Sequence, residues 1–279
     1  MALTLAFLGD VVGSVGRTAA VGAARRLREQ HGVQLVIANG ENARNGSGLS
    51  PDNFRELRKG SGPGGWGGID AVTLGDHWAR ERQVVPLLED PEQPVLRPAN
   101  LSPSAPGKRT VRLSPAGAPP VYVVTVLGRL FMPVPADSPF AAIDRELAAI
   151  PEHDAVVLVE IHAEATSEKQ AVAWHCLRNW TSDDRPRVVG VLGTHTHVAT
   201  ADARLLDHVL AAQTDVGMCG PMRSVIGRDI TATLDSMVRQ MPAPLEVASE
   251  DVRAQGAIIR IDTKYRRAEA IEPFDLAVS

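Results

Sequence analysis

Short runs of aliphatic residues alternate with helical segments along this chain, and that alternation constrains the fold most. Residues at helical spacing fill the segments 17–31 and 166–178 between such runs. Strands separated by helices form mainly parallel or mixed sheets with helices on both faces. The sequence therefore predicts an α/β fold, built either as one such sheet or as two sheets packed in a four-layer sandwich. The runs with the length of a buried strand are 3–8, 34–38, 70–74, 155–161 and 188–192.

Capping and turn residues indicate the rest of the organisation. Ser50 and Pro51 suit the N-cap and first position of a helix that continues over 53–59. We expect one domain over 1–279, because no internal repeat or linker divides the chain. The remaining expected elements are helices over 79–88, 139–149 and 230–240, strands over 121–127 and 257–261, a loop over 60–68, and a loop with an edge strand over 94–120.

Residues of metal-ligand type lie at the ends of the five predicted strands. In an α/β sheet the carboxyl ends of the strands are where ligands and catalytic groups collect, so we expect these side chains to meet at one edge of a sheet. His195 and His197 stand at i and i+2, where an extended chain would point their rings apart. We therefore expect the loop to twist both toward one point. The candidates are Asp10, Glu41, Asn42, Asp76, His162, His195 and His197.

The chemistry of these side chains favours a two-metal site. Carboxylate and imidazole ligands without thiolate suit Mn, Fe, Zn or Co. One tetrahedral ion needs about four ligands, so the larger set predicts two ions that share a bridging carboxylate, either Glu41 or Asp76. Paired ions stabilise the attacking and leaving oxygens of a phosphoryl displacement and make bound water acidic enough to attack. His77 follows Asp76 directly and is placed to act as a general acid on the leaving oxygen.

Composition excludes several classes of partner. The chain has 279 residues, is 44% hydrophobic and has a net charge of −4, so it can bury a large core. No block of Lys and Arg predicts binding to duplex nucleic acid or an anionic membrane, and no apolar run approaches the roughly 20 residues that cross a bilayer. Cys176 and Cys219 fit a reducing compartment. With no secretory leader pattern at the N-terminus, we expect a cytoplasmic protein.

Several motifs resemble the YmdB-like branch of the calcineurin-type metallophosphoesterases. They are GDVVG at 9–13, ANGENA at 38–43, HAEATSEK at 162–169 and GTHTHV at 193–198, with further likeness at 97–100, 128–132 and 214–221. The resemblance implies the metallophosphoesterase sandwich, with β-sheets flanked by helices and ligands at the C-terminal strand ends. It also implies a dinuclear phosphodiesterase, with iron or manganese, that acts on 2′,3′-cyclic or 3′,5′-cyclic nucleotides, and it allows a homo-oligomer.

The resemblance also implies a division of the ligands. By position, Asp10, Glu41 and His197 would hold one ion, with Asn42 close by. Glu41 would bridge to a second ion held by the residues that match the remaining ligands, Asp76, His162 and His195.

Asp76 departs from the family pattern, which usually has an asparagine at this place. With Asp76, three carboxylates offset the two ions. We expect the added charge to favour a mixed-valent pair or to weaken the attraction for dianionic monoesters relative to diesters.

Other interpretations of the sequence are weaker or remain open. GDVVGSVG at 9–16 lacks the order of a dinucleotide-binding loop, and no Walker A run or Gly-x-Ser-x-Gly elbow occurs. A phosphomonoesterase or 5′-nucleotidase with the same metals, and a regulatory metalloprotein with low turnover, remain alternatives. Glu164 and Glu168 either orient His162 or begin a helix, and Trp66 and Trp78 are candidates to stack on a base.

Overall fold

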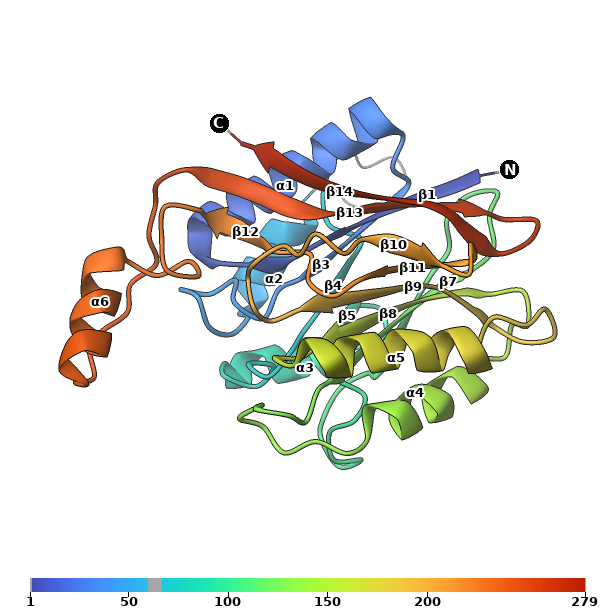
Figure 1. Cartoon of the computed structure of the whole chain (residues 1–279), viewed down its shortest axis with the longest axis horizontal. Coiled ribbons are helices and arrows are strands. Elements are labelled where there is room, and N and C mark those ends of the chain that lie inside the picture. The colour runs from blue at the N-terminus through green and yellow to red at the C-terminus, as the bar shows by residue number, and fades with distance from the viewer. Residues whose placement is uncertain (1, 60–66, 279) are drawn as a thin grey trace.

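Two β-sheets are stacked face to face, and helices cover the outer face of each sheet (Figure 1). The computed structural model describes residues 2–59 and 67–278, so residues 60–66 of the loop expected at 60–68, with Trp66, lie outside the described residues. In order, the layers are α1 and α2, the first sheet, the second sheet, and α4 with α5. The structure therefore confirms the predicted α/β sandwich in its two-sheet form.

The first sheet is mixed and has eight strands among the described residues. Strands β1, β3, β4 and β5 are parallel, so their carboxyl ends lie at the same edge. In spatial order the strands are β2 (Asp10–Val11), β12 (Met218–Pro221), β13 (Val252–Asp262), β1 (Ala2–Leu8), β3 (Leu35–Asn39), β4 (Ala71–Thr73) and β5 (Val95–Leu96), and β14 (Arg267–Ala277) pairs with β13.

The second sheet has six strands in the described part of the chain. Its central strands β7, β8, β9 and β11 are parallel, and short antiparallel strands form both edges. In spatial order the strands are β10 (Arg204–Leu206), β11 (Leu210–Gln213), β9 (Arg187–Thr194), β8 (Val156–His162), β7 (Val121–Leu127) and β6 (Thr110–Leu113).

The helices follow from local capping and from the apolar faces that they bury. Helix α1 ends at Gly32, whose φ of 63° is the left-handed conformation that glycine adopts at low cost. Ser50 caps α2 by accepting a hydrogen bond from the backbone N–H of Asn53, as its sequence position predicts. The helices are α1 (Gly13–His31), α2 (Pro51–Arg58), α3 (Val85–Glu89), α4 (Pro139–Ala148), α5 (Thr166–Asn179) and α6 (Ile230–Arg239), with a 3₁₀ turn at Arg82–Val84.

Among the described residues, three buried clusters hold the layers together. One lies between α1, α2 and the first sheet, and another lies between the second sheet and α4 and α5. The third fills the space between the two sheets and includes Leu5, Ile37 and Leu158. Because the central strands are buried on both faces, their sequences are continuous apolar runs. Helix α6 stands apart from these layers in Figure 1, and Thr233 is its one buried residue. No described helix has the length and apolar character to span a membrane.

Some predicted boundaries are wrong for identifiable reasons. The helix expected over 79–88 is replaced by the 3₁₀ turn and the short α3, because Pro86 cannot sit inside a continuous helix. Helix α1 begins at Gly13 instead of residue 17. A Cβ at Gly16 would lie 2.3 Å from the carbonyl oxygen of Cys219, so a glycine there lets the helix pack tightly on β12.

Candidate metal centre

The predicted ligands come from the ends of both sheets. Glu41 and Asp76 follow β3 and β4 of the first sheet, whereas His162 ends β8 and His195 follows β9 of the second sheet. Asp10 lies within the short strand β2, which pairs with β12. The expectation of one sheet edge was therefore wrong. The stacked sheets bring the carboxyl ends of two sets of parallel strands to one place.

Four of the predicted ligands form a tight cluster. One ligand atom from each of Glu41, Asp76, His162 and His195 lies within 4.8 Å of all the others. The Nε2 atom of His162 is central, at 3.0 Å from Asp76 Oδ1 and 3.2 Å from Glu41 Oε1. It also lies 3.1 Å from His195 Nδ1. Such convergence of carboxylate oxygens and imidazole nitrogens is the donor set of a transition-metal ion.

The other three predicted ligands adjoin this cluster. Asp10 Oδ1 lies 3.9 Å from His162 Nδ1 and 3.9 Å from His197 Nε2. Asn42 Nδ2 lies 3.0 Å from His197 Nε2 and 3.5 Å from Glu41 Oε1. The structure thus brings all seven together, with Glu41 between the two groups.

A buried atom without a partner shows that the site fits a cation. Asp10 is fully buried, and its Oδ1 has no hydrogen-bond partner among the described residues. A buried polar atom left unpaired carries a desolvation cost of about 1–3 kcal/mol, and more when it is charged. A cation held beside Asp10 would satisfy this oxygen.

The pKa values of these groups reflect burial and mutual contact. Burial raises the pKa of Asp10 to about 7. Burial also favours a raised pKa for Glu41, but the charge and hydrogen bond of His162, with His77, outweigh it and lower that pKa to about 2. For His162, burial favours a lower pKa, yet Glu41 and Asp76 raise it well above the usual value. The cluster therefore stabilises positive charge at its centre.

Unusual backbone conformations turn both histidines of the segment 195–197 toward the cluster. His195 has a φ of 98° and His197 a φ of 63°, a region that residues other than glycine seldom occupy. Asp215 Oδ2 holds the loop, because it accepts hydrogen bonds from the backbone N–H of Thr196 (3.1 Å) and from its hydroxyl (2.8 Å). Lys169 Nζ donates to the same oxygen at 2.8 Å, and both side chains are buried.

Asp215 and Gly75 are residues that sequence reasoning did not assign a role. A Cβ at Gly75 would lie 2.3 Å from Glu41 Oε2 and 2.4 Å from His162 Nε2, so only glycine fits beneath the cluster. In the sequence, Gly75 directly precedes the predicted ligand Asp76, and Asp215 lies within the motif at 214–221. Neither position indicates which atoms these two residues approach in the fold.

His77 lies at the mouth of the cluster. Its side chain is 26% exposed, and its backbone N–H donates to Glu41 Oε2 at 3.0 Å. Its Nδ1 lies 2.9 Å from Asn42 Oδ1. The contact of its ring Nδ1 with Glu41 Oε1 (3.3 Å) and the charges of Glu41 and Asp76 raise the pKa of His77. A partly exposed imidazole whose protonated form is favoured therefore lies beside the proposed ligands.

The two glutamates of HAEATSEK contact other groups than His162. Glu164 Oε2 lies 3.4 Å from His195 Nε2. Glu168 accepts the backbone N–H groups of Arg129 and Leu130. Trp78 is partly buried and packs against the outer core of the first sheet.

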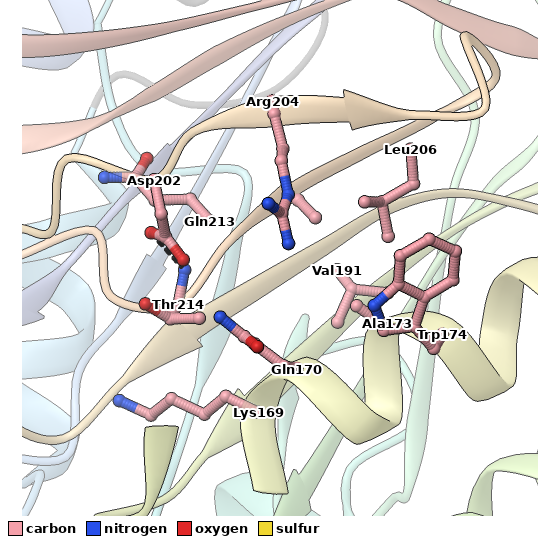
Figure 2. A pocket seen from close by; sticks show the side chains of 11 residues that line it. Lys169, Gln170, Ala173, Trp174, Val191, Asp202, Arg204, Leu206, Gln213 and Thr214 are labelled. Carbon is pink, nitrogen blue, oxygen red and sulfur yellow. Dashed lines mark hydrogen bonds between the residues drawn. The ribbon is translucent and has the colours of Figure 1, made fainter. Parts of the chain in front are cut away.

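Two hollows differ in their relation to the cluster. Figure 2 shows a pocket between α5 and strands β9, β10 and β11, with Trp174 and Arg204 among its lining residues. Its volume is about 10 Å³, room for about one water molecule, and none of the predicted ligands lines it. A second hollow of about 250 Å³ opens beside His197 and is lined by Val198, Met218, Met222 and Ile226 among others.

Comparison with known proteins places the fold and site in a class. The chain is 33% identical over 270 residues to a 2′,3′-cyclic-nucleotide 2′-phosphodiesterase of Bacillus subtilis (strain 168), covering 97% of this chain and 96% of that protein. The crystal structure of a novel phosphatase of Mycoplasma pneumoniae matches with a TM-score of 0.85 at 26% identity, covering 99% and 94% of the two chains. The fold and site thus define a phosphoester hydrolase of the metallophosphoesterase type.

A hypothetical protein from Thermus thermophilus matches with a TM-score of 0.85 at 38% identity, covering 98% and 99% of the two chains. The model of the YmdB-like protein family matches residues 6–274. The chain belongs to the YmdB-like family, which confirms the resemblance and the enzyme class expected from its motifs.

Proposed function

We propose that this chain is a dinuclear metal-dependent phosphodiesterase that hydrolyses cyclic nucleotides. The observation that carries the proposal is the cluster of Glu41, Asp76, His162 and His195 at the shared edge of the two sheets. The activity for which the Bacillus subtilis relative is named favours 2′,3′-cyclic nucleotides as the first substrates to test. We further propose that 1–279 acts as one domain in the reducing cytoplasm, where the free thiols of Cys176 and Cys219 would persist.

The seven predicted ligands divide between two ions in this proposal. Asp10, His197 and Asn42 would hold one ion, and Glu41 would bridge to the other. Asp76, His162 and His195 would complete the second site. Iron or manganese suits this mixture of carboxylate, amide and imidazole donors. Paired divalent ions supply charge stabilisation to a phosphoryl group and lower the pKa of water that they bind.

His77 has the position and the pKa shift of a general acid. Its partly exposed imidazole lies at the rim, and its raised pKa favours the protonated form that a general acid needs. The cost of expelling an alkoxide falls when a positioned acid protonates it. Its Nδ1 contacts Asn42 Oδ1 at 2.9 Å, and this contact orients the ring. The other ring nitrogen, Nε2, is therefore the one that would donate a proton to the leaving oxygen.

The hollow beside His197 is the proposed site for the nucleoside part of the substrate. Its volume of about 250 Å³ lies just below the range of about 300–1,000 Å³ for small-ligand sites. Met218, Met222 and Ile226 give it an apolar wall, which suits the faces of a base. A phosphate at the cluster would then lie next to this wall, because His197 belongs to both.

One paired measurement tests the proposed function. Purified protein is analysed for metal content, and the same sample is assayed with bis-p-nitrophenyl phosphate, p-nitrophenyl phosphate and 2′,3′-cyclic nucleotides. About two equivalents of iron or manganese with preferential diester turnover would support the proposal. Preferential monoester turnover would favour a phosphomonoesterase, the alternative that agrees with the description of the Mycoplasma pneumoniae structure as a phosphatase. Bound metal without turnover would favour a regulatory metalloprotein, and no metal after reconstitution would refute the site.

A further inference from the structure

A buried carboxylate lies behind the proposed metal ligands and bonds to side chains that are not themselves ligands. Glu160 is fully buried in β8, two residues before His162. Its Oε1 accepts hydrogen bonds from Asn39 Nδ2 and Thr194 Oγ1, each at 2.7 Å. Its Oε2 accepts from Thr125 Oγ1 at 2.8 Å. Because Asn39 belongs to the first sheet and the others to the second, Glu160 joins the two sheets beneath the cluster.

The donor and the acceptor of each hydrogen bond in this chain are fixed, from the backbone N–H of Glu41 to the hydroxyl of Thr194. The backbone N–H of Glu41 donates to Asn39 Oδ1 at 3.0 Å, so the amide of Asn39 must turn its Nδ2 toward Glu160. The Oε1 atom of Glu160 then acts as an acceptor. Thr194 has a single hydroxyl hydrogen, and its bond to Glu160 Oε1 uses that hydrogen.

The consequence falls on His162. Its Nδ1 lies 2.8 Å from Thr194 Oγ1. Since the hydroxyl hydrogen is already given to Glu160, the oxygen of Thr194 can only accept at this contact, and His162 Nδ1 must carry the proton. In the neutral ring the lone pair then resides on Nε2. Nε2 is the atom that faces Asp76 Oδ1 at 3.0 Å and Glu41 Oε1 at 3.2 Å.

One neighbour of His162 Nδ1 favours the opposite tautomer. Asn39 Nδ2 lies 3.3 Å from this nitrogen and could donate to it only if Nδ1 carried no proton. That separation is longer than the 2.8 Å to Thr194 Oγ1, and Asn39 Nδ2 already donates to Glu160 at 2.7 Å. The shorter contact with Thr194 therefore decides the tautomer.

We infer that Glu160 and Thr194 are positioning residues that fix the tautomer of His162, so that its Nε2 lone pair faces the metal centre. The inference rests on the proposed role of His162 as a ligand. Groups that orient a ligating imidazole through its other nitrogen are worth about 10–100-fold in metal affinity. Here the carboxylate acts through a threonine hydroxyl instead of contacting the imidazole itself.

Thr125 provides a matched control for Thr194. Both threonines are fully buried, both lie on strands that flank β8, and both donate to Glu160 at nearly equal distances, 2.8 Å and 2.7 Å. Of the two, Thr194 is the one that contacts His162. Thr125→Val and Thr194→Val therefore each remove one hydrogen bond from the same carboxylate, but only the second removes the acceptor of His162 Nδ1.

The experiment measures Mn²⁺ affinity by chelator competition for the full-length wild type, Thr194→Val, Thr194→Ser and Thr125→Val, with thermal unfolding of each metal-free protein. We expect Thr194→Val to bind Mn²⁺ about 10–100-fold more weakly than the wild type. Thr125→Val should stay close to the wild type in affinity while losing similar thermal stability. Thr194→Ser keeps the hydroxyl and should retain most of the affinity.

Equal losses of affinity in the two valine variants would overturn the inference and leave a purely structural role for Glu160. Long-range ¹H–¹⁵N spectra of the Zn²⁺-loaded wild type test it without any variant, because the inference requires a proton on His162 Nδ1 and metal on Nε2. A spectrum with the proton on Nε2 would also overturn it. Failure of the wild type to bind any metal would instead count against the proposed function.

Discussion

The side chain of Asp76 determines how much negative charge surrounds the proposed ions. Its Oδ1 lies 3.0 Å from His162 Nε2 and 3.3 Å from His195 Nδ1, where an asparagine oxygen could still bind a metal. The contacts with the two histidines keep the pKa of Asp76 far below its usual range despite burial, so the carboxylate stays ionised. The difference from an asparagine at this position is therefore one full negative charge.

We expect Asp76→Asn to retain metal and to shift the enzyme toward monoesters. One charge at about 4 Å is worth up to about 4 kcal/mol at an effective dielectric constant of about 20. About a third of that would change the monoester-to-diester ratio of kcat/KM about tenfold. The ratio is measured with p-nitrophenyl phosphate and bis-p-nitrophenyl phosphate, alongside metal analysis. An unchanged ratio with unchanged metal content would rule out this role for the added charge.

We expect His77→Ala to keep its metals and to lose turnover most for poor leaving groups, by about 10²–10⁴-fold. The reason is that a nitrophenolate leaves without protonation, whereas the alkoxide of a nucleotide does not. Cyclic nucleotides and bis-p-nitrophenyl phosphate are compared in the same preparation, with His31→Ala as an exposed-histidine control. Equal losses for both substrates would argue against an acid role for His77.

At the scale of elements, the segment HAEATSEK connects the metal centre to its surroundings from the end of β8 through the first turn of α5. Its first residue, His162, lies in the cluster, and Glu164 lies beside His195. Glu168 binds the backbone that follows β7, and Lys169 pairs with Asp215 beneath the loop at 195–197. One short segment thus supports the ends of β7, β8 and β9.

Lys169→Met should destabilise the protein and make the loop at 195–197 less rigid. The substitution leaves the carboxylate of Asp215 buried without its cation, and breaking a buried pair costs about 3–5 kcal/mol. We expect Mn²⁺ affinity to fall as well, because Asp215 holds Thr196 between the two histidines. Urea unfolding of the metal-free protein measures the first effect. The double variant Lys169→Met with Asp215→Asn should recover part of the stability, and no recovery would contradict this account.

The elements that sequence reasoning found are those whose signal is local. The strand at 188–192 and the capped helix after Ser50 are recognised from a few adjacent residues, and so are the polar residues that follow each strand. Strand β14 was not expected because charged residues interrupt its apolar residues and it contains Pro273. Strand β2 has only two residues and exists through its pairing with β12.

The candidate site shows the same division between local and distant information. Each ligand could be named from its own strand end, but not the sheet that its strand would join. Nor could the sequence show that Asp215 would support Thr196 or that Glu160 would reach Asn39, 121 positions away in the chain. Such contacts depend on how the two sheets stack, and no short pattern records that.

At the scale of the whole molecule, bound metal would join the two sheets. Glu41 and Asp76 belong to the first sheet and His162 and His195 to the second, so any ion held by this cluster links both halves of the sandwich. The third core cluster already holds the sheets together away from the site. Metal binding would therefore add stability to the fold as a whole, by an amount that depends on ion concentration and affinity.

The size of that stabilisation should depend on pH. In the metal-free protein, Asp10 has a pKa of about 7 against 3.8 in an unfolded chain, so its contribution to stability is present below about pH 4 and is lost as the pH rises through 7. The raised pKa of His162 acts in the same direction, since its contribution is present below pH 6.5 and is lost above its folded value. The metal-free protein should thus lose stability as the pH rises from about 4 to 7 through Asp10, and His162 should extend that loss above pH 6.5.

A metal ion binds Asp10 and His162 only when they have lost their protons, and its positive charge then takes the place of those protons. We expect Mn²⁺ at about 100 times its Kd to raise the Tm by about 5–10 °C at pH 8, from a stabilisation of about 2.7 kcal/mol. At pH 5.5 the same Mn²⁺ concentration should give a much smaller shift, because protons compete for Asp10 and His162. Thermal unfolding of chelator-treated protein with and without Mn²⁺ measures both shifts. Asp10→Asn should flatten the pH dependence of the metal-free protein, and equal Mn²⁺ shifts at the two pH values would show that these groups do not couple metal binding to folding.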